Sequence, residues 1–175
     1  MALYKESMIN KIEDDLAGRN QNWDALDTYL AEKAFKGALL RKGTAQSIPH
    51  NTATALTWTD VVYNIGNIYS AGLPTRLTIP SGVNKIIVKA SVGFQENTTG
   101  KREVYIYKNG NGNYNGRATA TVIPVSGTGA IAHVVSPVLE VVAGDYFEIF
   151  AMQTSGGSLN VTDWYNIWFA IEAIE

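Results

Sequence analysis

Apolar residues in the first part of the chain recur at alternating intervals of three and four positions. The series consists of Ala2, Ile9, Ile12, Leu16, Trp23, Leu26 and Leu30, with Lys5 and Arg19 as its polar members. This spacing is the a and d pattern of a heptad repeat, which places every member on one stripe of a helix. The pattern predicts a helix from about Leu3 to Lys33 whose stripe needs a covering partner.

Two alternatives remain open for this segment. Gly18 lies near its middle, and glycine costs about 1 kcal/mol in a helix interior. The helix could therefore break between Gly18 and Asn22, with Asn22 capping a second helix from Trp23 to Lys36. The stripe could also belong to an ordinary amphipathic helix that packs on its own domain, because a coiled coil of about four heptads is only marginally stable alone.

Beyond Gly43 the apolar period changes to two. Lys85 to Phe94 and Glu103 to Lys108 alternate apolar with other residues, and the pattern continues over 138–142, 146–152 and 167–174 between clusters of Gly, Asn, Ser and Pro. Such segments, without helical patterns between them, indicate an all-β sandwich. Residues 1–42 hold nearly half of the charged residues and no proline. We therefore expect a helical attachment or trimerisation segment over residues 1–42 and a β-sandwich head over residues 43–175.

The composition disfavours several classes of function. A net charge of -2 without a run of Lys and Arg offers no surface for nucleic acid. The absence of cysteine excludes disulfides, thiolate nucleophiles and zinc–thiolate clusters. No apolar run reaches the roughly 18 residues of a membrane span, and the N-terminus lacks the pattern of a signal peptide. We therefore expect that the chain neither binds nucleic acid nor inserts into a membrane.

The sequence also provides little for catalysis. The two histidines, His50 and His133, are expected at strand edges or in loops and not as bases or metal ligands. The Gly-x-Ser-x-Gly, His-Glu-x-x-His and phosphate-loop motifs are absent. No pair of carboxylates can be assigned to a cleft, which disfavours a glycan-degrading enzyme. We expect a protein without catalytic residues, metal or cofactor.

Aromatic residues in polar surroundings are the candidates for binding. Five of them lie in or beside segments rich in Asn, Gly, Ser and Asp: Tyr63, Tyr69, Tyr114, Trp164 and Tyr165. Aromatic rings stack on sugar rings while amides and hydroxyls bind the sugar hydroxyls, so these residues are candidate receptor contacts. They could instead close the ends of the sandwich or a subunit interface. Tyr105 and Tyr107 are expected to point outward from one strand, where oligomerisation would cover them.

The order of several motifs after Gly43 resembles a known family. The motifs are Asn51-Thr-Ala-Thr-Ala-Leu-Thr-Trp58, Thr75-Arg-Leu-Thr-Ile-Pro80 followed by Gly82, Tyr105-Ile-Tyr-Lys-Asn-Gly110, Leu139-Glu-Val-Val-Ala-Gly-Asp145-Tyr and Ile167-Trp-Phe-Ala-Ile171. Together they resemble the jelly-roll head shared by complement component one-q and the tumour necrosis factor ligands, in the divergent form of bacteriophage fibre and appendage proteins. Val83, Asn84 and Lys85 stand where that family usually has an aromatic residue.

The resemblance implies a ten-stranded jelly-roll sandwich that assembles as a closed homotrimer without catalytic activity. With the heptad segment, it leads us to expect a trimeric phage fibre, spike or baseplate appendage, located on the virion surface after assembly in the bacterial host cytoplasm. The N-terminal segment would attach to other virion proteins, and the head would bind a host-surface glycan or protein. The alternative is a capsid decoration or head-fibre protein without a required receptor.

Overall fold

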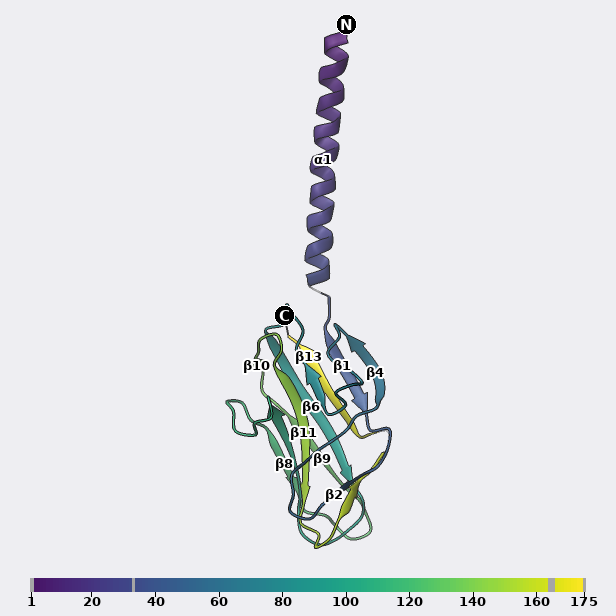
Figure 1. Cartoon of the computed structure of the whole chain (residues 1–175), viewed down its shortest axis with the longest axis vertical. Helices are drawn as coiled ribbons and strands as arrows, with labels where there is room; N and C mark the ends of the chain where they lie inside the picture. Colours follow the sequence, from purple (N-terminus) through teal and green to yellow (C-terminus); the bar gives the residue numbers. More distant parts are fainter. Residues whose placement is uncertain (1, 33, 164–165, 175) are drawn as a thin grey trace. The chain divides into compact units, whose positions relative to one another are not determined.

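The computed structural model of the chain describes residues 2–32, 34–163 and 166–174, and within the helix it describes the side chains of residues 8–30. The chain divides into two compact units, Met1–Ala34 and Phe35–Glu175. The first unit is helical and the second is a β-sandwich, as the change of apolar period predicts (Figure 1).

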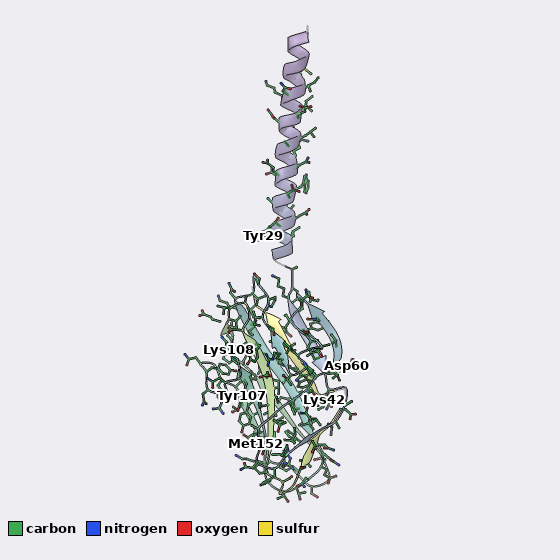
Figure 2. The ribbon with its side chains drawn as sticks, in the orientation of Figure 1. Tyr29, Lys42, Asp60, Tyr107, Lys108 and Met152 are labelled. Carbon is green, nitrogen blue, oxygen red and sulfur yellow. The ribbon has the colours of Figure 1, made fainter. Side chains whose placement is uncertain are left out.

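The helical unit is a single helix, α1 (Ala2–Glu32). It continues through Gly18, so the break considered at Gly18–Asn22 is not present. Arg19 and Asp15, which lie one helical turn apart on either side of Gly18, form a salt bridge with 3.0 Å between Nη2 and Oδ2. Within this unit the apolar stripe is uncovered, and side chains project from the helix on all sides (Figure 2). Ile9, Ile12, Leu16, Trp23, Leu26 and Leu30 are between 42% and 64% exposed.

The second unit consists of two antiparallel sheets. Sheet A contains β1 (Gly37–Arg41), β2 (Gln46–Ile48), β4 (Asp60–Ile65), β6 (Lys85–Phe94), β9 (Ala130–Val135), β10 (Leu139–Glu140), β12 (Leu159–Val161) and β13 (Trp168–Ala173). Sheet B contains β3 (Thr54–Ala55), β5 (Arg76–Thr78), β7 (Arg102–Lys108), β8 (Thr119–Val122) and β11 (Tyr146–Gln153). Over the described residues this gives thirteen strands, so the expected number of ten is not confirmed.

The first strand lies earlier in the chain than expected. β1 pairs with β13 on one side and with β4 on the other, and its residues Ala38 and Leu40 are fully buried. The boundary between the units therefore falls after Ala34 and not near Gly43. The strand Gly37–Arg41 is only five residues long, which is too short for its period to be separated from that of the preceding helix.

The core lies between the sheets and follows the period of two. In β6 the side chains of Ile86, Val88 and Ala90 are buried, and in β11 the side chains of Phe147 and Ile149 face them from the other sheet. Removing a large aliphatic or aromatic side chain from water contributes roughly 1.5–3 kcal/mol. Because successive residues of a strand point to opposite faces, burial of these apolar positions leaves the residues between them on the outer faces of the sandwich.

Candidate binding surface on sheet A

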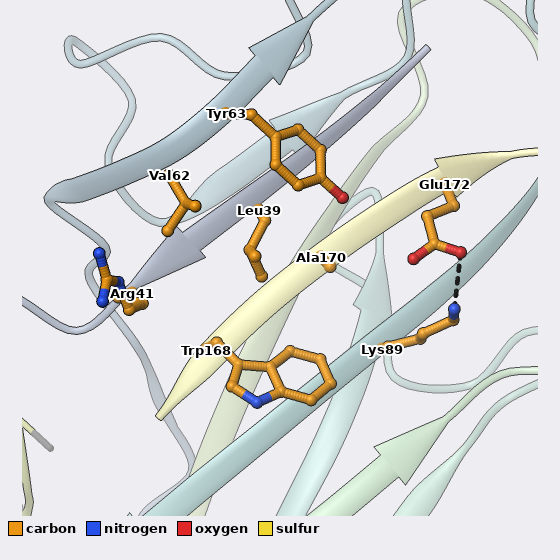
Figure 3. A pocket seen from close by; sticks show the side chains of 8 residues that line it. All are labelled: Leu39, Arg41, Val62, Tyr63, Lys89, Trp168, Ala170 and Glu172. Atoms are coloured by element: carbon orange, nitrogen blue, oxygen red, sulfur yellow. Dashed lines mark hydrogen bonds and ion pairs between the residues drawn. The ribbon is translucent and has the colours of Figure 1, made fainter. Parts of the chain in front are cut away.

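The outward face of sheet A carries a shallow hollow of about 500 Å³. Strands β4, β1, β13 and β6 supply its lining, and their side chains project into one space (Figure 3). The lining consists of Leu39, Arg41, Val62, Tyr63, Lys89, Trp168, Ala170 and Glu172. The hollow is therefore apolar at its centre and charged along its rim.

Strand register places these residues together. Leu39 of β1 is opposite Ala170 of β13, Ala170 is opposite Lys89 of β6, and Lys89 is opposite Val135 of β9. Directly paired residues point to the same side of a sheet. Since the neighbours of Leu39 in the chain, Ala38 and Leu40, are buried in the core, this row faces outward.

Two ion pairs border the hollow. Lys89 Nζ lies 2.6 Å from Glu172 Oε2, and Arg41 Nε lies 3.1 Å from Asp60 Oδ2. All four side chains are between 30% and 47% exposed, so each pair adds little to the stability of the separate chain. Such pairs gain importance when a partner excludes water from them, because a lower dielectric strengthens the attraction.

Tyr63 forms one wall of the hollow. Its ring packs edge-on against Phe35, with 6.1 Å between the ring centroids and 62° between the ring planes. Burial raises the pKa of the Tyr63 hydroxyl, the charge of Glu172 raises it further, and Lys89 opposes both. The hydroxyl therefore stays protonated at neutral pH and can donate a hydrogen bond to a bound partner.

The three described residues among the five aromatic candidates do not form one site. Tyr63 lies in the hollow, whereas the half-buried Tyr69 donates a hydrogen bond from its hydroxyl to the Trp58 carbonyl oxygen at 2.7 Å. Tyr114 packs edge-on against Phe147, with 6.5 Å between centroids, and lines a different hollow. Trp164 and Tyr165 lie outside the described residues.

Tyr105 and Tyr107 do point outward, from sheet B. Tyr107 stacks on Phe150, with 4.0 Å between the ring centroids, while Gly112 approaches its ring so closely that a Cβ there would lie 2.7 Å from Tyr107 Cε1. Burial raises the pKa of Tyr105 to about 12, and the negative Glu103 adds to the shift. Both tyrosines are half-buried by groups of their own chain. The sequence could show that they point outward, but not that the loop after β7 covers them.

The hollow itself was missed by the sequence reasoning. Trp168 and Phe169 are neighbours in an apolar segment, and only the pairing of β13 decides that Phe169 enters the core while Trp168 faces outward. Lys89 and Glu172 are 83 positions apart in sequence, and no local pattern joins them. A tryptophan that alternates with buried residues in the closing strand was the available signal.

Chemically, this surface is suited to binding. Its apolar centre can bury a hydrophobic group, and its rim offers two cations and a carboxylate. Within residues 2–32, 34–163 and 166–174, no three His, Cys, Asp or Glu side chains gather closely enough to hold a metal ion. Among the same residues, no helix is long and apolar enough to cross a membrane.

Comparison with solved structures identifies the fold. Murine APRIL, crystallised at pH 5.0, matches with a TM-score of 0.60 and 12% sequence identity over 81% of this chain and 100% of that chain. Eiger TNF from S. frugiperda matches with a TM-score of 0.58 and 10% identity over 81% of this chain and 93% of that chain. No protein-family model and no curated protein sequence matches the chain. The second unit therefore has a jelly-roll fold like that of tumour necrosis factor. The predicted all-β sandwich with an N-terminal helix is confirmed, whereas the homotrimer stays a prediction.

Proposed function

We propose that the chain is a homotrimeric structural and binding protein without enzymatic activity. In this proposal the heads associate through the hollow on sheet A, and the helices associate through the heptad stripe. The observation that carries the proposal is the apolar centre of that hollow, where Leu39 and Trp168 are only half-buried and Val62 is 44% exposed.

The fold supports self-association. The tumour necrosis factor-like neighbours in fold are homotrimers, which is consistent with association of this chain with itself in a closed ring. The helix adds a second surface, because Ile9, Leu16 and Trp23 lie on one heptad stripe that has no covering partner within its own unit. Both units of the chain thus present apolar surface that further copies of the same chain would bury.

We further propose that the trimer is a phage virion appendage whose head binds a host-surface glycan or protein. Support comes from the sequence of motifs in the head and from the heptad segment that precedes it, an arrangement suited to attachment at one end and binding at the other. The helix would join the trimer to other virion proteins. A capsid decoration protein would share this architecture but would need no receptor.

Two matched substitutions test the association surface. Leu39→Lys places a charge in the hollow on sheet A, whereas Met152→Lys places the same charge on the outward face of sheet B. The proposal predicts that Leu39→Lys lowers the mass of the full chain measured by light scattering at micromolar concentration, while Met152→Lys leaves it unchanged. An unchanged mass for both variants, with the wild-type chain trimeric, would assign the association to another surface.

A further inference from the structure

The loop that joins β7 to β8 contains three Asn-Gly pairs: Asn109-Gly110, Asn111-Gly112 and Asn115-Gly116. No other asparagine of the chain precedes a glycine. In such a pair the backbone nitrogen of the glycine can attack the side-chain amide carbon of the asparagine, because glycine has no Cβ to hinder the approach. The attack requires that the two groups reach each other in the right geometry. The contacts of each pair therefore decide whether it reacts.

The Asn109 side chain is bonded at both of its polar atoms. Nδ2 donates a hydrogen bond to Asp145 Oδ1 at 2.7 Å, and Oδ1 accepts one from the Tyr146 amide at 2.8 Å. The main chain around it is also closed, since Lys108 and Asn111 exchange two backbone hydrogen bonds of 3.0 Å and 2.9 Å. Loss of the amide would set a second carboxylate against that of Asp145. The Asn109 side chain is therefore not free to turn toward the Gly110 nitrogen.

Asn111 is restrained by its own main chain and by the glycine that follows it. Its Oδ1 accepts a hydrogen bond from the Asn113 amide at 2.8 Å, and its backbone takes part in the two bonds to Lys108. Gly112 lies against the Tyr107 ring, where a Cβ would be 2.7 Å from Cε1. Closure of a ring on the Gly112 nitrogen would have to break that hydrogen bond and shift that contact.

Asn115 has none of these restraints. It is exposed, and neither its side chain nor its backbone makes a hydrogen bond with any residue that the structure describes. The Gly116 nitrogen donates to none of them either. One hydrogen bond, from the Arg117 amide to the Tyr114 carbonyl oxygen at 3.2 Å, closes the turn around the pair. Asn115 also borders a hollow of about 380 Å³, so its amide has room to rotate.

The packing of the head requires a glycine after Asn115. Gly116 has a φ of 83°, which residues with a side chain rarely adopt. A Cβ at this position would also collide with the side chain of Leu139, which is only 6% exposed. The same turn that needs glycine for its shape therefore places a reactive neighbour beside Asn115.

We propose that Asn115 is a site of spontaneous deamidation, whereas the fold protects Asn109 and Asn111. The Gly116 nitrogen gives up its proton and forms a bond to Asn115 Cγ, and the bond from Cγ to Nδ2 breaks, so that ammonia leaves. Water then opens the five-membered imide at either of its carbonyl carbons and leaves an aspartate or an isoaspartate. The reaction consumes one water molecule and releases one ammonia molecule. A neutral amide becomes a carboxylate, so the formal net charge of the chain changes from -2 to -3.

This site is independent of the proposed association of heads. The loop supplies no lining residue to the hollow on sheet A, so the reaction is expected for a monomer and for a trimer that forms through that hollow. Failure of either proposal therefore leaves the other standing.

Peptide mapping of the full chain tests the assignment. The chain is incubated at mildly alkaline pH, and trypsin then cuts after Lys108 and Arg117 to release one peptide, 109–117, that contains all three pairs. Tandem mass spectrometry locates each conversion of amide to acid. We expect the reaction at Asn115 to be at least about tenfold faster than at Asn109 or Asn111, because ring closure there must first break hydrogen bonds. Equal rates at the three positions, or a faster reaction at Asn109, would overturn the proposal.

The same incubation in guanidinium chloride separates the effect of the fold from that of the local sequence. The denatured chain keeps the three Asn-Gly pairs but loses the bonds from Asn109 to Asp145 and Tyr146 and from Asn111 to Asn113. The three rates should then become similar. If Asn115 keeps its tenfold lead in the denatured chain, the fold is not the cause and the proposal fails.

Two matched variants of the folded chain complete the test. Asn115→Gln lengthens the side chain by one methylene, so a larger ring would have to form, and the rapid gain of one negative charge in ion-exchange chromatography should disappear. Asn84→Gln makes the same change at another exposed asparagine whose side chain has no hydrogen bond with the described residues, and it should leave that gain unchanged. An undiminished gain of charge in Asn115→Gln would assign the modification to another residue.

Discussion

The side-chain nitrogen of Lys42 donates a hydrogen bond to the backbone oxygen of Thr57 at 2.7 Å, although Lys42 is only 3% exposed. Figure 2 shows Lys42 within the sandwich unit. The same nitrogen donates to Gln46 Oε1 at 2.9 Å, and no ion pair with a carboxylate neutralises it among the described residues. Burial lowers the pKa of Lys42 from 10.5 to about 8, and the more distant Asp163 opposes the shift.

The lowered pKa of Lys42 predicts that the free energy of unfolding rises with pH above about 8. Between pH 8 and pH 10.5 the unfolded chain binds more protons at Lys42 than the folded chain does, so removing protons favours the folded state. The rise is at most about 1.4 kcal/mol per pH unit. Urea denaturation between pH 7 and pH 9 measures it, because tyrosines with the ordinary pKa of about 10 stay mostly protonated in this interval.

Lys42→Met is the control for this effect. The variant removes the titrating group, so its stability should be nearly independent of pH over the same interval. It also leaves the Thr57 carbonyl without this donor, which costs about 1–3 kcal/mol at neutral pH. A pH slope equal to that of the wild-type chain would show that Lys42 is not the group responsible.

Two tyrosines give a second, paired prediction. Tyr69→Phe removes the hydroxyl that donates to the Trp58 carbonyl oxygen at 2.7 Å, so it should lower the free energy of unfolding by about 1 kcal/mol. Tyr114→Phe removes a buried hydroxyl that has no hydrogen-bond partner among the described residues, so it should leave stability equal or raise it by about 1 kcal/mol. Chemical denaturation compares the two, and equal losses would contradict the assignment of the Tyr114 hydroxyl as unpaired.

The loop between β7 and β8 gives a third prediction through Gly112. A Cβ at this position would lie 2.7 Å from Tyr107 Cε1 and 2.8 Å from Cζ, so Gly112→Ala must displace the ring that stacks on Phe150. We expect a loss of about 1–3 kcal/mol in thermal or chemical unfolding. Gly157→Ala is the matched control, since nothing lies within 4 Å of its Cβ position, and it should change stability by less than about 0.5 kcal/mol.

The position of β1 gives a fourth prediction about shortened chains. A chain that begins at Phe35 keeps all strands of sheet A, whereas one that begins at Gly43 loses β1, with Ala38 and Leu40 from the core and the pairing partners of both β13 and β4. Circular dichroism should show cooperative thermal unfolding for the first chain only. Cooperative unfolding of the chain that begins at Gly43 would contradict the claim that the sandwich requires β1 to fold.

The sequence predicts the fold of the head better than its surfaces. The alternation in β6 was visible because ten residues in a row follow it, and the Asn109-Gly110 turn was visible because both residues adopt positive φ angles, 52° and 74°, that few other pairs allow. The heptad stripe was equally plain. In contrast, Gly18 suggested a break that does not occur, because a local cost of about 1 kcal/mol does not end a 31-residue helix.

The candidate sites depend on pairings that local patterns do not contain. Lys89 meets Glu172 only because β6 pairs with β13. Tyr114 was singled out for its polar neighbours, yet its ring belongs to the packing around Phe147 and its hydroxyl is buried. Period and composition fix which residues are buried, but register decides which exposed residues meet.

Self-association of the chain can be read from the mass of the full chain in solution. Light scattering coupled to size exclusion at micromolar concentration measures that mass without depending on the shape of the particle. We expect a mass of three times 19.0 kDa, that of a homotrimer. A mass of 19.0 kDa under these conditions would contradict it.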